Sequence, residues 1–152
     1  HEVKQENLSE IVDRALVSFR RSSLSSGIDV EVKAPGKADA LADALELELL
    51  IVNLLKNAAA ASKDSREKLI SVQLSEEANE WLLSVSDHGQ VISDKLLSRL
   101  SHPAKSFSDG LGLGLSICRL IAENHGGKLT FKPNNSKGLI VTLHLPKANK
   151  EI

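Results

Sequence analysis

Hydrophobic and polar positions follow two different periods along this chain. Residues 8–19, 44–62 and 115–125 carry apolar side chains every three to four positions, which predicts three amphipathic helices. Asn7 and Asp43 stand immediately before the first two of these segments and are typical helix N-cap residues. Alternating or short apolar runs predict strands at residues 28–32, 38–41, 69–74, 81–85, 128–131 and 139–145.

The order of these elements indicates the fold class. Helices come singly, and the strands at 69–74 and 81–85 are separated by turn residues that suit a hairpin. We therefore expect an α+β fold, a two-layer α/β sandwich in which about three helices cover one face of a mixed, mostly antiparallel sheet. Residues 87–101 are expected to hold a turn and a short polar helix. Residues 101–114, rich in Ser and Gly without periodicity, are expected to form a mobile loop.

Composition narrows the class of protein. The chain has 152 residues, 41% of them apolar and 26% charged, which fits one domain spanning residues 1–152. A net charge of -1 argues against binding nucleic acid or an anionic membrane through bulk charge. One cysteine, Cys118, excludes a disulfide framework, and no apolar run approaches the roughly 20 residues that span a bilayer. Because the chain has no methionine and begins at His1, we expect it to be excised from a longer protein, with processing or tag removal as the alternative.

The long helical segment carries a polar cluster of Asn53, Lys56 and Asn57 beside its apolar face. Asn53 and Asn57 are four residues apart, so their side chains emerge on one side of the helix. An amide oxygen is a hard ligand that suits Mg²⁺, and a neighbouring lysine suits phosphate. The alternative is that the amides cap or crosslink neighbouring elements, as buried polar groups commonly do.

Asp87-His88-Gly89 follows the predicted strand at residues 81–85. A carboxylate at a strand end can accept a hydrogen bond from an exocyclic amine. Gly89 allows a tight turn that lets a flat base approach. An ordinary Asp-x-Gly turn is the alternative.

Three glycines, Gly110, Gly112 and Gly114, alternate with leucines and lead into a predicted helix. Glycine lets backbone N–H groups approach an anion, and a helix N-terminus favours negative charge. The spacing matches neither the G-x-G-x-x-G of dinucleotide-binding folds nor the phosphate loop of nucleoside triphosphatases. A flexible linker is the alternative, but the alternating leucines indicate packing.

In this order, the three motifs resemble the ATP-binding catalytic domain of sensor histidine kinases. That family shares its fold with DNA gyrase, the heat-shock chaperone ATPase and mismatch-repair ATPases. Residues 43–61 resemble the family's N box, residues 87–89 the start of its G1 box, and residues 110–116 its G2 box. Lys105 resembles the lid lysine of nitrogen- and dicarboxylate-sensing kinases.

The resemblance implies a role for each matched residue. Asn57 would bind Mg²⁺, and Asn53 would help to order the metal and the phosphates. Lys56 and Lys105 would neutralise phosphate charge, so that Asn53 and Lys56 would be the catalytic side chains. Asp87 would accept a hydrogen bond from the adenine amine. The backbone of the glycine loop would hold the phosphates and hinge a lid, through Gly110, Gly112 and Gly114.

The same resemblance implies a transferase of two-component signalling, with ATP and Mg²⁺ as cofactors. The domain would donate the γ-phosphate to a histidine on a separate dimerisation domain, and a response-regulator receiver domain would be the next partner. No nucleic acid partner is expected. The parent would be a homodimeric phosphoprotein with a cytoplasmic kinase domain. An anchor in the inner or plasma membrane can hold this parent protein. Two alternatives stay open: a degenerate nucleotide-binding or partner-docking module of this fold, and an anti-sigma-type serine kinase.

The chain departs from the family's pattern at several positions, one of which lies in the G1 box. The G1 box usually reads Asp-x-Gly-x-Gly, and Val91 stands at the second glycine. A β-branched residue is strained at positive φ. Either this turn differs from the family's, or the base pocket is tighter.

Overall fold

The computed structural model describes residues 1–102, 112–135 and 137–147. Its helices are α1 (Leu8–Arg20), α2 (Ala44–Ala61), α3 (Asp94–Ser101) and α4 (Gly112–Asn124), with a 3-10 turn η1 at Ser23–Ser25. Its strands are β1 (Lys4–Asn7), β2 (Asp29–Lys33), β3 (Asp39–Ala42), β4 (Leu69–Glu76), β5 (Glu80–Ser86), β6 (Lys128–Pro133) and β7 (Leu139–Pro146). None of the helices in these ranges is long and apolar enough to cross a membrane.

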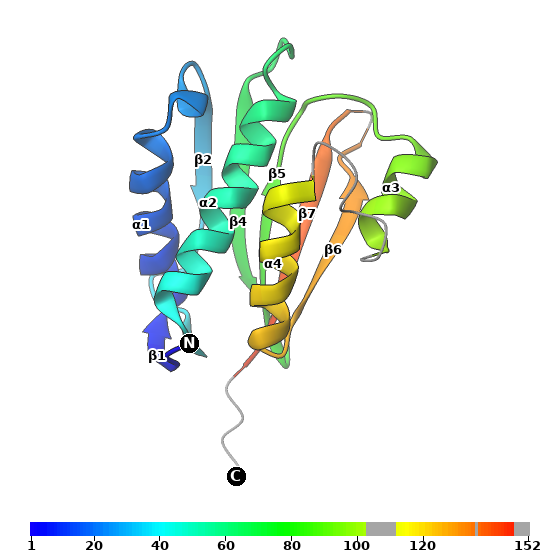
Figure 1. Cartoon of the computed structure of the whole chain (residues 1–152). Helices are drawn as coiled ribbons and strands as arrows, with labels where there is room; N and C mark the ends of the chain where they lie inside the picture. Colours follow the sequence, from blue (N-terminus) through cyan, green and yellow to red (C-terminus); the bar gives the residue numbers. More distant parts are fainter. Residues whose placement is uncertain (103–111, 136, 148–152) are drawn as a thin grey trace.

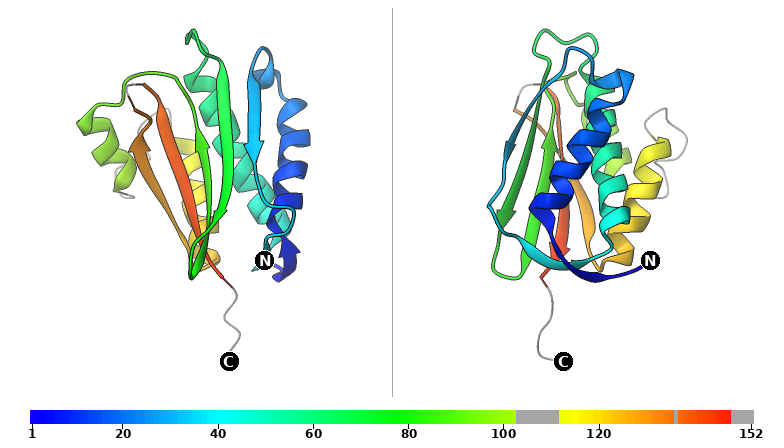
Figure 2. Two further views of the ribbon diagram at one scale, coloured as in Figure 1. Left: turned by 180° about the vertical axis from the view of Figure 1, so that it is seen from behind. Right: turned by 90° about the vertical axis from the view of Figure 1, so that its left-hand side faces the viewer.

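Five strands form one layer in the order β2-β4-β5-β7-β6. β2 and β4 run parallel, whereas β5 pairs antiparallel with β4 and β7, and β6 pairs antiparallel with β7. Helices α1, α2 and α4 cover one face of this sheet, as the side view shows (Figures 1 and 2). The expected two-layer sandwich with a mixed, mostly antiparallel sheet is confirmed.

The core lies between these two layers and is almost entirely aliphatic. Every second residue of β4, from Ile70 to Leu74, is buried, as the alternation in the sequence predicts. Helix α2 meets these strands with a face that includes the fully buried Leu50 and Leu54. Burying a leucine side chain contributes about 1.5–3 kcal/mol, so this face holds α2 firmly on the sheet.

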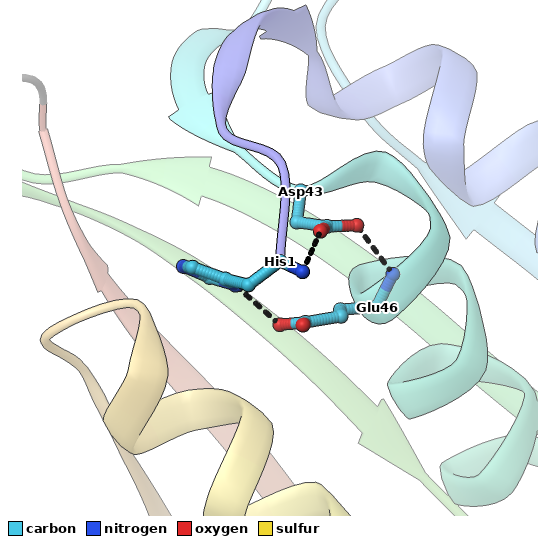
Figure 3. A group of neighbouring side chains, drawn as sticks. All are labelled: His1, Asp43 and Glu46. Atoms are coloured by element: carbon cyan, nitrogen blue, oxygen red, sulfur yellow. Dashed lines mark hydrogen bonds and ion pairs between the residues drawn. The ribbon is translucent and has the colours of Figure 1, made fainter.

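The start of α2 is fixed by its N-cap, Asp43, whose Oδ1 accepts a hydrogen bond from the Glu46 N–H at 3.0 Å. Its Oδ2 accepts a second bond from the Glu2 N–H. These backbone hydrogen bonds lower the pKa of Asp43 below its ordinary value. His1 completes the group through a 2.9 Å contact between its Nδ1 and Glu46 Oε1 (Figure 3).

The end of α4 lies beside this cap. His125, whose side chain is 1% exposed, accepts a hydrogen bond from the Asp43 N–H through Nε2 at 3.0 Å. Its Nδ1–H donates to the carbonyl oxygen of Ile121 at 2.9 Å. Because the end of α4 meets the start of α2, the two helices run antiparallel. Their other ends therefore lie together at the opposite end of the molecule (Figure 1).

Two elements differ from the sequence prediction. The polar residues Lys4–Asn7 form β1, which pairs antiparallel with β3 in a separate two-stranded sheet, whereas no strand was expected there. Helix α4 begins at Gly112 rather than Leu115, so residues 112–114 form its first turn instead of the end of a mobile loop. Residues 103–111, which hold most of that expected loop, lie outside the described residues.

Candidate functional site

Asn53 and Asn57 lie where α2 meets the first turn of α4. A methyl group placed on Gly114 would lie 3.6 Å from Asn53 Cβ and 3.7 Å from Asn57 Nδ2. Gly114 thus brings the start of α4 against both amides, with the N-terminal N–H groups of a helix close by. The structure therefore joins the predicted amide pair with one predicted glycine, although the two are far apart in sequence.

The amide of Asn57 has a buried nitrogen, Nδ2, without a hydrogen-bond partner among the described residues. An unpaired buried polar atom costs about 1–3 kcal/mol, so folding alone gives no reason for an amide here. The two ends of an asparagine amide exchange by a half-turn about the last side-chain bond, which would place Oδ1 at the same point. Asn57 can therefore offer a hard oxygen ligand beside the start of α4.

Asp87 is placed by the register of β5 and β7, which pairs Ser86 with Ile140. Its own N–H then donates to the Leu139 carbonyl at 3.1 Å, and its side chain is buried, with 5% exposed. Oδ1 accepts from the N–H groups of Gly89 at 2.8 Å and Leu139 at 3.3 Å. Oδ2 accepts no hydrogen bond from any described residue.

Burial raises the pKa of Asp87 above its ordinary value, and the hydrogen bonds from Gly89 and Leu139 and the charge of His88 oppose this shift. Desolvation disfavours the ionised form, so a donor placed at Oδ2 would stabilise the carboxylate.

A side chain at position 89 would not fit, because the backbone of Gly89 lies close to the end of α2. A methyl group there would lie 2.5 Å from the Ala61 carbonyl oxygen, well inside contact distance.

The sequence left open whether Val91 strains the turn after β5. Among the described residues that are not glycine, only Asn135 has positive φ, so the backbone at Val91 is unstrained. The Val91 side chain is 71% exposed. The turn therefore holds Val91 without backbone strain, and its exposed side chain does not narrow the site.

Asp87 and Asn57 both line a cavity of about 360 Å³. Its lining is mostly apolar and comes from α2, β5, the turn after β5, α3, α4 and β7. The lining residues are Leu54, Asn57, Ala58, Ala60, Ala61, Val85, Asp87, Gln90, Ile92, Leu96, Leu100, Leu115, Leu139 and Val141. Apolar walls with a few convergent polar groups are typical of small-molecule sites. The Asp87 carboxylate in this lining suits the amine of a flat base.

Several lining residues were missed by sequence reasoning, above all Ile92 in the turn and Leu96 and Leu100 of α3. The spacing of Leu54, Ala58 and Ala61 places them on one helix face and could have revealed part of the wall.

Other predicted residues are placed less directly. Lys56 is half-buried on α2 and is not among the described residues that line the cavity. Gly112 begins α4. Lys105 and Gly110 lie outside the described residues, so their predicted roles stay predictions.

Comparisons with known proteins identify the family and the fold. A family model described as "Histidine kinase-, DNA gyrase B-, and HSP90-like ATPase" matches residues 42–149. The chain is 32% identical to the C4-dicarboxylate transport sensor protein DctB of Rhizobium meliloti, covering 93% of this chain and 23% of DctB. It is 30% identical to the sensor protein FixL of Bradyrhizobium diazoefficiens, covering 98% of this chain and 30% of FixL. The chain thus spans less than a third of the length of these two curated relatives.

Among solved structures, the catalytic domain of the histidine kinase ThkA is similar over its whole length. The TM-score is 0.81 at 26% identity, covering 97% of this chain and 98% of that domain. Both the order of the elements and the extent of the fold are therefore shared.

Proposed function

The chain belongs to the family of histidine kinase-, DNA gyrase B- and HSP90-like ATPases, and we propose that it is the ATP-binding catalytic part of a two-component sensor kinase. The observation that carries the proposal is the cavity of about 360 Å³, which is lined by both the buried Asp87 and by Asn57 beside the start of α4. This set of groups suits adenine at Asp87 and phosphates at α4.

In this proposal, adenine lies between the apolar walls, and its exocyclic amine donates to Asp87 Oδ2. Asn57 would present Oδ1 to Mg²⁺, and Asn53 would help to hold the metal and the phosphates. The N–H groups of the first turn of α4 face the phosphates, with the helix dipole adding to their effect. Bound Mg²⁺ would neutralise phosphate charge during phosphoryl transfer, a reaction that depends mainly on positioning and charge.

The phosphoacceptor would be a histidine on a separate dimerisation domain. Two of the described histidines have structural partners: His88 Nδ1–H donates to the Leu69 carbonyl, and His125, at the opposite end of α4 from the site, has both ring nitrogens bonded. We also propose that the parent is a homodimer whose phosphohistidine supplies a response-regulator receiver domain. A cytoplasmic kinase domain, with a parent held at the membrane in some architectures, fits the sensor proteins that it resembles.

Asn57→Ala tests the metal-binding role. We expect the variant to lose tenfold or more of the affinity that Mg²⁺ adds to binding of a non-hydrolysable ATP analogue. Its free energy of unfolding should stay equal or rise slightly, because an unpaired buried amide is removed. Titration calorimetry with and without Mg²⁺ measures the first quantity, and urea unfolding measures the second.

Asn124→Ala is the matched control, since Asn124 is an exposed asparagine at the end of α4, and it should change neither quantity. Absence of binding to the wild-type chain at millimolar nucleotide would rule out the proposed function. An Asn57→Ala variant that keeps its full Mg²⁺ dependence would rule out only the metal-binding role.

The acceptor is tested in the parent protein with γ-labelled ATP. Label that is stable to base and lost in acid identifies phosphohistidine, as the proposal requires. Acid-stable phosphoserine on a protein substrate would instead favour the serine-kinase alternative.

A further inference from the structure

A second cavity, of about 320 Å³, lies behind the turn that carries Asp87. It is formed by the loop after α2, the turn after β5 and the turn between β6 and β7. Its described lining residues are Ser65, Arg66, Glu67, His88, Asn134, Asn135 and Lys137. Every one of them is polar or charged, in contrast to the apolar walls around Asp87.

The arginine and lysine side chains that line this cavity have no described partner. Neither Arg66 nor Lys137 takes part in an ion pair or a side-chain hydrogen bond with any described residue, and both side chains are exposed. Lys68, in the same loop, instead donates to the backbone carbonyls of Ser62, Lys63 and Ser65, which is a structural role. The one acid, Glu67, lies 3.9 Å from His88 Nε2. The cavity therefore has a positive character that the chain as a whole, at -1, does not share.

Amide donors complete the lining. Asn134 Nδ2 donates one hydrogen bond to the Asp87 carbonyl at 2.8 Å, which leaves its second N–H. The tight turn from Asn134 to Gly138 holds Asn135 at a φ of 52°. Two asparagines beside two unpaired cations form a donor-rich surface.

We propose that this cavity binds a small phosphorylated metabolite, a phosphomonoester that carries hydroxyl groups. The planar fork of Arg66 can donate two parallel hydrogen bonds to a phosphate, and Lys137 supplies a second charge to match the dianion. The asparagine amides suit the hydroxyl groups, and the volume leaves room for several carbon atoms beside the phosphate. This site goes beyond the proposed nucleotide-binding function.

The two cavities share one wall, so the second ligand acts on the first site. Asp87 faces the nucleotide cavity and the next residue, His88, faces the second cavity. The His88 carbonyl accepts from Ser65 Oγ at 2.7 Å, and the Asp87 carbonyl accepts from Asn134. A methyl group on Gly138 would lie 1.9 Å from the Asp87 carbonyl oxygen, so the backbones are in direct contact. Groups that touch the phosphomonoester therefore also fix the carbonyl of the residue proposed to recognise adenine.

Binding is tested on the isotope-labelled chain with glycerol 3-phosphate as the probe. We expect the amide resonances of Arg66, His88 and Lys137 to shift, with saturation in the millimolar range. Arg66→Ala and Lys137→Ala should each weaken binding tenfold or more, because each removes a charge-assisted contact. Lys63→Ala is the matched control: it removes an exposed cation of the same loop that does not line the cavity, and it should leave binding unchanged.

Inorganic phosphate is the second probe, and it should bind at least threefold more weakly because it lacks the hydroxyl groups. Equal affinities would overturn the assignment of a metabolite. No shift at 20 mM probe, shifts confined to residues 53–57 and 112–114, or an equal loss in Lys63→Ala would overturn the site itself. These measurements need no nucleotide, so they stand even if the proposed function fails.

The coupling is measured as the Kd of the ATP analogue with and without saturating glycerol 3-phosphate. We expect at least a threefold change that disappears in Arg66→Ala, within the range usual for linked sites. An unchanged Kd would overturn the coupling and leave the binding result as it stands.

Discussion

At the scale of single residues, Asp87 combines two tasks in one carboxylate. Oδ1 accepts two backbone N–H groups and so fixes the turn after β5, while Oδ2 accepts none from the described residues and Asp87 lines the cavity. No described cation pairs with it, and burial raises its pKa. A residue chosen for stability alone would carry no charge there, which is why this position is informative about function.

Asp87→Asn should separate the two tasks. Because the folded pKa of Asp87 is raised, the native state holds its proton more tightly, and the stability that protonation provides is lost as pH rises through the folded pKa. The variant has no ionisable group at this position and so does not lose this stability. Its free energy of unfolding, measured in urea, should therefore rise relative to that of the wild type from about pH 4 upward. Affinity for the ATP analogue should fall tenfold or more. A stability difference that does not change between pH 3 and pH 7 would contradict the raised pKa.

Gly89→Ala tests the close approach of the turn to α2. The added methyl group would overlap the Ala61 carbonyl, so we expect a loss of about 1–3 kcal/mol in the free energy of unfolding. Gly36→Ala is the control: its methyl group meets nothing within 4 Å, and its φ is not positive. That change should stay within about 0.5 kcal/mol. Equal effects of the two substitutions would show that the contact at Gly89 is relaxed in solution.

At the scale of elements, local signals in the sequence predicted α1 and α2 well. Asn7 and Asp43 each cap their helix as expected, since a side-chain cap is a local interaction. β1 was missed because Lys4–Asn7 is entirely polar and becomes a strand only by pairing with the distant β3. The first turn of α4 was missed because glycine disfavours helices, and Gly112 and Gly114 both lie in this turn.

The candidate site divides in the same way. Asn53, Asn57, Asp87 and Gly89 could be chosen from motifs, whereas the second cavity could not. Its wall depends on three loops that are brought together only by the fold, and polar loop residues carry no period that marks them in advance.

Contact between α2 and α4 can be followed through Cys118. This thiol is fully buried on α4, with its Sγ 3.6 Å from the Leu50 carbonyl of α2. Burial raises the pKa of Cys118 to about 12. Because the thiolate is the reactive form, a disulfide reagent at pH 8 should label the native protein at least a hundredfold more slowly than the urea-unfolded chain. Rapid labelling in the native state would show that the two helices separate readily.

At the scale of the whole molecule, the candidate site and Trp81 lie in different regions. Trp81 Nε1–H donates to the Asp39 carbonyl at 3.1 Å, and its ring packs near Leu8 and Leu47, in the first turns of α1 and α2. Asn57 is ten residues further along α2, about 15 Å at 1.5 Å per residue. Fluorescence of this single tryptophan therefore reports unfolding of the sandwich without direct contact with a ligand.

If the sandwich unfolds as one unit, a ligand at the far end must stabilise the surroundings of Trp81. An ATP analogue with Mg²⁺ at 100 times its Kd should raise the free energy of unfolding by about 2.7 kcal/mol, seen by tryptophan fluorescence in urea. The free energy of unfolding obtained from the rate of Cys118 labelling should rise by the same amount. A shift in thiol labelling without one in fluorescence would show that the two regions unfold separately.

The cluster around Asp43 has a mechanical consequence. Glu2 and His1 bind to the base of α2, and His125 links that base to the last turn of α4. Both helices then extend as rigid elements to the end where Asn57 and Gly114 lie near each other. A displacement of the N-terminal segment would therefore tilt both helices at their far ends, because no loop intervenes between the Asp43 cluster and either helix.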